Sequence, residues 1–274
     1  MSRSLAGAPF YKMSGSGNDF VVVDARERQR PELEQPETIS RVCARATGVG
    51  ADGVVLLAAD PRLDFRMIYF NADGSRASMC GNAALCCTRL FSELGQRPAG
   101  EIRFETDSGP LQARMRGGQP EIDLAPVSLV RPEIALAGHR GFSRLGYALA
   151  GVPHVTALVD DIESLDVVGV GRAIRTAPEL RPEGANANFV ARGDGGWRIR
   201  TYERGVEGET LACGTGAVAS AILIESWGLG DSPISLVTRS GRVLTVRLRR
   251  ESDRWLPSLS GEGRIVFRGS FGEL

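Results

Sequence analysis

The sequence contains a single lysine, Lys12, although 33 of its 274 residues are basic, so arginine carries nearly all of the positive charge. A pyridoxal-phosphate enzyme forms a Schiff base between the cofactor and a lysine, and only this one position could supply it. The Walker A loop of nucleotide-binding proteins needs a lysine inside a glycine-rich loop, and no such loop occurs. The shortage of lysine therefore argues against pyridoxal phosphate and excludes a Walker A loop.

No charge of one sign predominates, because 33 acidic residues balance the basic ones. Nucleic acids and anionic membranes select basic surfaces, so neither is an expected partner. No apolar run approaches the ~18 residues that cross a bilayer. Residues 1–10 also lack the basic segment and long apolar stretch of a secretory signal. We therefore expect a cytoplasmic globular protein that acts on a small molecule.

Cysteine and histidine are scarce, with five and two residues respectively. An odd number of cysteines without a signal peptide favours thiols in a reducing compartment over a disulfide framework. No Cys-x-x-Cys pair occurs, and neither His139 nor His154 has a second ligand nearby, so we expect no metal site. Cys43, Cys86 and Cys87 stand among apolar residues, and we expect them to be buried packing residues.

The sequence repeats itself at a long offset. Ile102–Gly109 (IRFETDSG) resembles Ile234–Gly241 (ISLVTRSG), which begins 132 residues later. Met79–Ala84 (MCGNAA) resembles Ala212–Ala217 (ACGTGA), which begins 133 residues later. Matches that keep their order at a nearly constant offset indicate an internal duplication.

Each copy consists of short alternating strands and one helix, at 83–94 and 216–227, that is apolar on nearly every side. A helix of this composition is a buried one. We predict an α+β fold of two pseudo-symmetric β-rich lobes, each wrapped around a central buried helix. The N-terminal lobe is expected at residues 1–124 and the C-terminal lobe at 125–261, while residues 262–274 are considered as a strand that returns to the first lobe.

Cys80 and Cys213 each stand where a loop becomes the predicted buried helix. The free N–H groups and the positive dipole end of a helix stabilise a nearby anion, and a thiol there ionises more easily. Both cysteines are followed by glycine and a small polar residue, in Gly81–Asn82 and Gly214–Thr215. This pattern is suited to binding a carboxylate beside a thiolate, because glycine lets the backbone approach a ligand closely.

Two similar lobes that meet face to face would bring the two thiols to opposite sides of one cleft, where we expect the active site. Stereoinversion at a carbon requires that arrangement, since one thiolate removes a proton from one face and the other thiol protonates the opposite face. The two helix starts would stabilise the negative charge that builds on a carboxylate of the substrate. Such a reaction needs no cofactor and no metal.

The ordered motifs resemble those of diaminopimelate epimerase, a cofactor-independent amino-acid epimerase, over essentially the whole chain. Single motifs such as Pro-His are weak, whereas the ordered set with both cysteine motifs is specific. The set comprises Lys12–Phe20 (KMSGSGNDF), Gly48–Gly53 (GVGADG), Asn71–Ser75 (NADGS), Cys80–Asn82 (CGN), Pro153–His154, Asn186–Val190 (NANFV), Glu203–Gly205 (ERG) and Ala212–Gly216 (ACGTG).

The resemblance implies a role for each of twelve residues. The acid and base would be Cys80 and Cys213, and proton movement beside them would be assisted by Glu203 and His154. The reacting carboxylate would be held by Gly81, Asn82, Gly214 and Thr215. Further substrate contacts would come from Asn18, Asn71, Asn186 and Arg204, with Arg204 binding the distal end. The reaction implied is epimerisation of LL-2,6-diaminoheptanedioate to the meso form, for lysine and peptidoglycan precursor synthesis, in a cytoplasmic homodimer.

Two departures from the family pattern leave an alternative substrate open. Val152 stands where many members have asparagine, and Gly53 stands where some have a substrate-facing glutamine. Both positions concern the distal end of the substrate, so the nearest alternative is a racemase of another amino acid on the same scaffold.

Two hypotheses come from other functional classes. A thiol redox protein could form a Cys80–Cys213 disulfide, but without a Cys-x-x-Cys pair we interpret that bond as an inactivating oxidation product. A metabolite-binding scaffold without chemistry would leave the two cysteines at matched helix starts unexplained.

Overall fold

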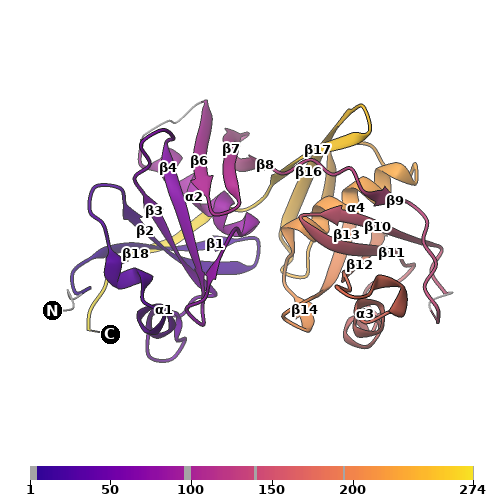
Figure 1. The fold of residues 1–274 in the computed structure, drawn as a ribbon, viewed down its shortest axis with the longest axis horizontal. Helices are drawn as coiled ribbons and strands as arrows, with labels where there is room; N and C mark the ends of the chain where they lie inside the picture. The colour runs from indigo at the N-terminus through magenta and orange to yellow at the C-terminus, as the bar shows by residue number, and fades with distance from the viewer. Residues whose placement is uncertain (1–4, 96–99, 139–140, 194, 274) are drawn as a thin grey trace. The chain divides into compact units, whose positions relative to one another are not determined.

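A computed structural model describes residues 5–95, 100–138, 141–193 and 195–273 (Figure 1). The chain forms two compact units, which are described separately: Met1–Ile122 with Gly261–Leu274, and Asp123–Ser260. Among the described residues, no helix is both long enough and apolar enough to span a membrane.

The first unit is a mixed sheet with two α-helices. Along the sheet, the strands pair in the order β18, β1, β2, β3, β4, β6, β7, β8, and the short β5 also pairs with β4. The β2–β3 and β4–β6 pairs are parallel and the others antiparallel. The bounds are β1 (Pro9–Gly15), β2 (Asn18–Ala25), α1 (Pro36–Cys43), β3 (Gly53–Ala58), β4 (Phe65–Asn71), β5 (Arg76–Ala77), α2 (Gly81–Glu93), β6 (Glu101–Thr106), β7 (Gly109–Arg116), β8 (Gln119–Asp123) and β18 (Arg264–Ser270), with a 3₁₀ turn at Pro31–Glu34.

The second unit repeats this pairing order strand for strand. The pairing order is β9, β10, β11, β12, β13, β15, β16, β17, with β14 also on β13, and the parallel pairs are again the third and the fifth along the sheet. The bounds are β9 (Val130–Arg131), β10 (Arg144–Ala150), β11 (Val152–Leu158), α3 (Val167–Arg175), β12 (Asn186–Gly193), β13 (Gly196–Glu203), β14 (Gly208–Thr210), α4 (Gly214–Ser226), β15 (Ile234–Val237), β16 (Val243–Glu251) and β17 (Arg254–Ser260), with a 3₁₀ turn at Pro178–Leu180.

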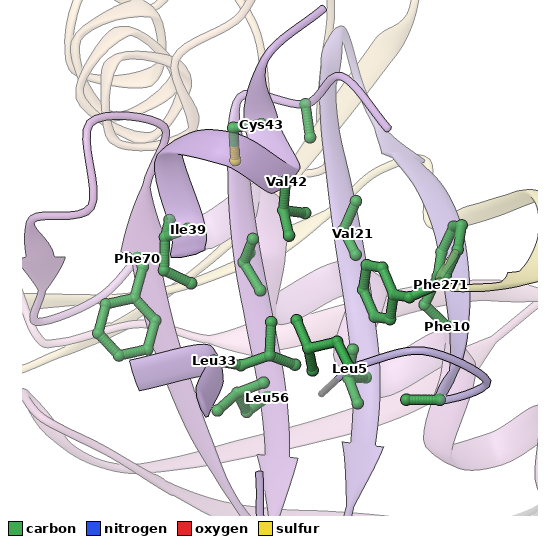
Figure 2. Packing of buried hydrophobic residues seen from close by; sticks show 14 of the residues in the cluster. Leu5, Phe10, Val21, Leu33, Ile39, Val42, Cys43, Leu56, Phe70 and Phe271 are labelled. Carbon is green, nitrogen blue, oxygen red and sulfur yellow. The ribbon is translucent and has the colours of Figure 1, made fainter. Parts of the chain in front are cut away.

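In each unit, one helix packs against each face of the central strands. In the first unit, α1 packs against one face through Ile39 and Val42, which join Val21 and Leu56 in the core cluster of Figure 2. The other face surrounds α2, which contacts β1, β2, β4, β7 and β18. Alternate side chains of a strand point to opposite faces, and so the apolar run in β2 supplies both cores.

The helices α2 and α4 are the buried helices around which the two units are built (Figure 1). In α4 every residue from Gly216 to Ile224 is buried. The predicted α+β class, with two β-rich units around a central helix each, is confirmed. The predicted helix bounds were late by two residues at each start, since α2 begins at Gly81 and α4 at Gly214.

The single lysine has a structural role in the first unit. Lys12 on β1 is 8% exposed, pairs with Asp19 at 2.5 Å and donates to the backbone oxygen of Gly50. The ammonium therefore joins β1 to the loop that precedes β3. A paired, buried charge of this kind fixes the geometry of the segments it links.

Candidate functional site

In each unit, the helix start and three strand ends meet at the same end of the sheet. In the second unit, β11 and β12 run parallel and start together, with His154 opposite Asn186. Because β13 is antiparallel to β12, its last residue, Glu203, lies at that same end. The first unit has the same layout, with Asn18 at the start of β2, Gly53 at the start of β3 and Asn71 at the end of β4.

Cys213 is the N-cap residue of α4, and its sulfur interacts with the first helical turn. The Gly216 N–H donates to Sγ over 3.4 Å, and the hydroxyl of Thr215 lies 3.5 Å from the same sulfur. The side chain is nearly buried, with the residue 9% exposed. Donors directed at a sulfur stabilise negative charge on it.

Cys80 is the N-cap residue of α2 in the first unit, with the same extended backbone as Cys213. Gly15, on β1, lets the start of α2 approach closely, because a Cβ there would lie 2.7 Å from the Asn82 backbone oxygen. Cys80 is half-buried, and Gly81 follows it as the first helical residue. The backbone N–H groups of Gly81 and Asn82 belong to the first turn, which helical geometry leaves without intrahelical acceptors.

A chain of side-chain hydrogen bonds orients Asn82. The Asp52 carboxylate accepts from Asn18 Nδ2 at 3.0 Å, and Asn18 Oδ1 accepts from Asn82 Nδ2 at 2.7 Å. Since a carboxylate at neutral pH only accepts hydrogen bonds, Asp52 determines which way each amide faces. Asn82 Oδ1 is buried and has no hydrogen-bond partner among the described residues. Arg45 holds Asp52 in turn, at 2.6 Å.

Asn71 has local hydrogen bonds at the end of β4. Its Nδ2 donates to the Ser75 hydroxyl over 3.0 Å, and its backbone N–H donates to the backbone oxygen of Ser75 over 2.9 Å. These bonds close the turn that leads through β5 to Cys80. Asn71 is half-buried at the same sheet end as Asn18, but no hydrogen bond between the two is present in the described part of the first unit.

His154 is fully buried on β11, in contact with a second buried side chain, Asn188. The distance between His154 Nδ1 and Asn188 Nδ2 is 3.2 Å. Burial lowers the pKa of His154 to about 3, and the positive charge of Arg204 acts in the same direction. The imidazole is therefore neutral at physiological pH.

Glu203 ends β13, and Arg204 follows it beside Asn186. Burial raises the pKa of the Glu203 carboxyl, and the hydroxyl of Thr210 opposes that shift only in part. The backbone N–H of Arg204 donates to Asn186 Oδ1 over 2.7 Å, and its guanidinium donates to the backbone oxygen of Glu183 over 3.3 Å. A carboxyl with a raised pKa keeps its proton to a higher pH than an ordinary glutamate, which suits it to exchanging protons with a neighbouring group.

The two positions that depart from the family pattern have different surroundings. Val152 is half-buried as the first residue of β11. At Gly53, a Cβ would lie 2.5 Å from the Phe70 backbone oxygen and 2.6 Å from the ring of Tyr69. The buried Tyr69 ring thus takes the space that a side chain at position 53 would need.

The other three cysteines are buried. Burial raises the pKa of the Cys43 thiol to about 11, and it raises the pKa of Cys86 and of Cys87 as well. These thiols stay protonated at neutral pH, which suits packing residues rather than bases.

The sequence-predicted site residues are thus divided between the two units. Direct contacts join Asn18 to Asn82 in the first unit, and Arg204 to Asn186 and Thr215 to Cys213 in the second. Sequence reasoning missed Asp52 and Asn188, although both lie inside motifs that carried the resemblance. Their signal was a short polar side chain next to or within a buried strand, at Asp52 just before β3 and at Asn188 inside β12.

The chain is similar to known proteins over almost its full length. The profile of the family described as diaminopimelate epimerase matches residues 10–130 and 146–259. The diaminopimelate epimerase of Gemmatimonas aurantiaca is 45% identical, with 97% of this chain and 99% of that protein covered. The enzyme of the same name from Aquifex aeolicus is 40% identical, covering 96% and 98%.

A solved structure has the same fold at low sequence identity. It is a phenazine biosynthesis PhzC/PhzF protein from Clostridium difficile, with a TM-score of 0.74, 14% identity, and 96% of this chain and 99% of that chain covered. The family profile, the two relatives and the matched cysteine motifs agree, and the chain therefore belongs to the diaminopimelate epimerase family.

Proposed function

We propose that this chain epimerises LL-2,6-diaminoheptanedioate to the meso form, with Cys80 and Cys213 as the acid and base. The observation that carries the proposal is the repeated helix start: each unit has a cysteine as the N-cap of its buried helix, at the same point of the same connectivity. Membership of the family supports the choice of substrate.

The reaction requires the two thiols to act on opposite faces of one α-carbon. One thiolate takes the α-proton, so that an S–H bond forms as the C–H bond breaks and its electron pair is delocalised into the carboxylate. The second thiol then gives its proton to the other face and becomes the thiolate. The net change is inverted configuration, with the protonation states of the two sulfurs exchanged.

Backbone N–H groups would stabilise the charge that develops in this step. Helical geometry leaves the N–H groups of Gly81, Asn82, Gly214 and Thr215 without intrahelical acceptors, which suits them to the reacting carboxylate. Glu203, whose pKa burial raises, is proposed to exchange protons with the thiol machinery of the second unit. No step calls for a cofactor.

The distal end of the substrate is proposed to bind at Arg204, with further substrate contacts from Asn18, Asn71 and Asn186. A guanidinium matches a carboxylate with two parallel hydrogen bonds, and only one of its donors is needed for the Glu183 backbone oxygen. Asn186 accepts a hydrogen bond from the backbone of Arg204 and so helps to position its guanidinium.

A racemase of another amino acid is the second candidate, because Gly53 and Val152 change the lining proposed for the distal end. Tyr69 fills the space beside Gly53 and would shorten that end of the site. A substrate panel separates the two candidates, since a site built for the dicarboxylate should lose most of its turnover with amino acids that lack the second carboxylate.

We infer in addition that the enzyme is a cytoplasmic homodimer, as family resemblance implies. β18 has two large apolar side chains at its surface, Val266 and Phe267, each 46% exposed, which are suited to a protein contact. Light scattering of the purified protein measures the assembly directly, and replacing Phe267 with Glu should shift a dimer toward monomer.

Proton NMR in D2O, with LL-diaminopimelate, reductant and no added cofactor, tests the function. We expect deuterium at the α-carbon together with the meso isomer. Cys80→Ser and Cys213→Ser should each reduce inversion by roughly 10²- to 10⁴-fold, because a serine hydroxyl is a far weaker acid than a thiol.

The matched control is Cys87→Ala, which removes a buried thiol of the first unit and should keep the wild-type rate per folded molecule. Wild-type turnover in either serine variant would disprove the two-thiol mechanism. Turnover of a monocarboxylic amino acid without turnover of the dicarboxylate would favour the racemase.

A further inference from the structure

The two ring nitrogens of His154 have different surroundings. Nδ1 lies 3.2 Å from the amide nitrogen of Asn188. Nε2 is buried and has no hydrogen-bond partner among the described residues. A neutral imidazole carries one proton, and the hydrogen bond made by one nitrogen decides which nitrogen holds it.

The orientation of the Asn188 amide is fixed by its other partners. Asn188 Nδ2 donates to the backbone oxygen of Val155 over 3.0 Å, and Oδ1 accepts from the Thr201 hydroxyl over 3.0 Å. A backbone carbonyl can only accept, so the group that faces it must be the amide nitrogen. The remaining N–H of that nitrogen points to His154 Nδ1.

His154 Nδ1 is therefore an acceptor, and the single proton of the neutral ring lies on Nε2. The ring stays neutral because it is fully buried, beside the cationic Arg204. A buried N–H without a partner is costly to a folded protein and marks a group that acquires its partner in the course of function.

We propose that Asn188 is a positioning residue that holds His154 as the neutral Nε2–H tautomer, so that His154 serves the reaction as a hydrogen-bond donor to an anion and not as a base. The tautomer follows from the contacts alone. Its catalytic use rests on the proposed function, in which both a thiolate and a substrate carboxylate are available as the anion.

A base at His154 would need an unprotonated nitrogen directed at the site. Asn188 occupies the unprotonated one, and Nε2 already carries the proton. The neighbouring element supports this arrangement, because a Cβ on Gly216 of α4 would lie 2.4 Å from Asn188 Oδ1. The amide is held by hydrogen bonds to β11 and β13, and turning it over would set its oxygen against the backbone oxygen of Val155.

Nitrogen-15 NMR of histidine side chains tests the tautomer without reference to activity. The chain has two histidines, so a His139→Gln variant leaves His154 as the only signal. We expect an unprotonated Nδ1 and a protonated Nε2 throughout the range from about pH 5 to 8, in which an ordinary histidine titrates. A proton on Nδ1, or a ring that becomes cationic in that range, would overturn the proposal.

The catalytic part is tested with Asn188→Asp, whose carboxylate accepts a hydrogen bond from Nδ1 and draws the proton there. We expect the NMR signature of the other tautomer and a kcat at least ~10-fold lower with a nearly unchanged KM, because a stabilising contact of the transition state is lost. A shifted tautomer with wild-type kcat would show that the tautomer does not matter to the reaction.

A second variant covers the case in which Asn188→Asp does not fold. Thr201→Val removes the donor to Asn188 Oδ1 while keeping the side-chain shape, and it should populate both tautomers and lower kcat in proportion. The matched control is Thr156→Val on β11, the strand of His154; its hydroxyl instead contacts Ser220 at 3.2 Å. It should alter stability alone, with the His154 signals and kcat of the wild type.

The anion is identified by adding LL-diaminopimelate to the Cys80→Ser variant. A displaced Nε2–H signal on addition indicates the substrate carboxylate, whereas a signal that follows thiol alkylation of the wild type indicates a thiolate. A signal that responds to neither would refute the donor role. Absence of epimerase activity in the wild type would refute the proposed function but leave the tautomer assignment standing.

Discussion

The cysteines of this chain have different roles, which depend on their surroundings. Cys43, Cys86 and Cys87 are buried among apolar side chains, where burial raises the pKa of each thiol. Cys213 has a helix N–H directed at its sulfur, 3.4 Å away. Composition does not distinguish these cysteines, but their position relative to a helix start does.

The burial of Glu203 is expected to lower the stability of the fold while it serves the proposed function. Because burial raises its pKa in the folded protein, the folded state binds the proton more tightly than the unfolded state. The carboxylate therefore destabilises the fold increasingly as pH rises above about 4.3, the ordinary pKa of glutamate.

Glu203→Gln should accordingly be more stable than the wild type at pH 7. This advantage should shrink as the pH is lowered from 7 toward about 4.3, because the carboxyl of the wild type then becomes protonated. Urea unfolding at several pH values measures the difference. The same variant should be a poorer epimerase. A stability gain that did not depend on pH would show that the charge of Glu203 is not its cause.

At the scale of elements, the sequence predicted the two buried helices but began each one two residues late. Glycine is a weak helix former, so the sequence alone does not indicate that Gly81 and Gly214 are helical. In the structure each glycine is the first helical residue, where the cysteine before it provides the N-cap. Glycine carries little penalty there, since the first turn has few intrahelical bonds to support.

The hydrogen bonds of the site could not be predicted in the same way. Asn18 and Asp52 are 34 positions apart, as are His154 and Asn188, and each pair meets only because two strands run parallel after a helical crossover. Motifs place residues along the chain, whereas these contacts depend on strand order and register. The family resemblance identified the candidate site residues, whereas their hydrogen-bond partners are seen only in the structure.

Substitution of Gly216 tests how tightly α4 packs on the sheet. Alanine is the better helix former by ~1 kcal/mol, but a Cβ here would lie 2.4 Å from Asn188 Oδ1 and 3.3 Å from Cys213 Sγ. We expect Gly216→Ala to lower the free energy of unfolding by about 1–3 kcal/mol, as overpacking does.

Urea unfolding measures this loss, and a double-mutant cycle identifies its origin. In an Asn188→Ala background the obstructing oxygen is gone, so the same glycine substitution should cost less. An equal cost in both backgrounds would place the strain elsewhere.

The whole molecule consists of one connectivity used twice, with one difference at the sheet margin. β9, which pairs with β10, comes from the segment just before it, whereas the matching β18 is recruited to β1 from the end of the chain. Phe271, just beyond β18, stacks on Phe10 with ring centroids 4.7 Å apart, within the core of Figure 2. Phe271 is thus part of the first unit's core.

This asymmetry can be measured because Trp197, Trp227 and Trp255, the only tryptophans in the sequence, all lie in the second unit. Phe271→Ala should destabilise the first unit by roughly 3–5 kcal/mol, as large aromatic truncations in a core do. We expect part of the circular dichroism signal to be lost at lower urea than the tryptophan fluorescence change. Coincident transitions would show instead that the units unfold together.

The positional twins of the two units carry different chemistry. Asn71 and Glu203 end matching strands, so that a neutral amide in the first unit corresponds to an ionisable group in the second. Asn18 and Val152 begin matching strands, and there an amide corresponds to an apolar side chain. A protein assembled from two identical subunits would alter both copies with every mutation. A gene that encodes the unit twice can change one half and keep the other. The duplication therefore allowed a symmetric ancestor to acquire a site whose two halves carry different side chains.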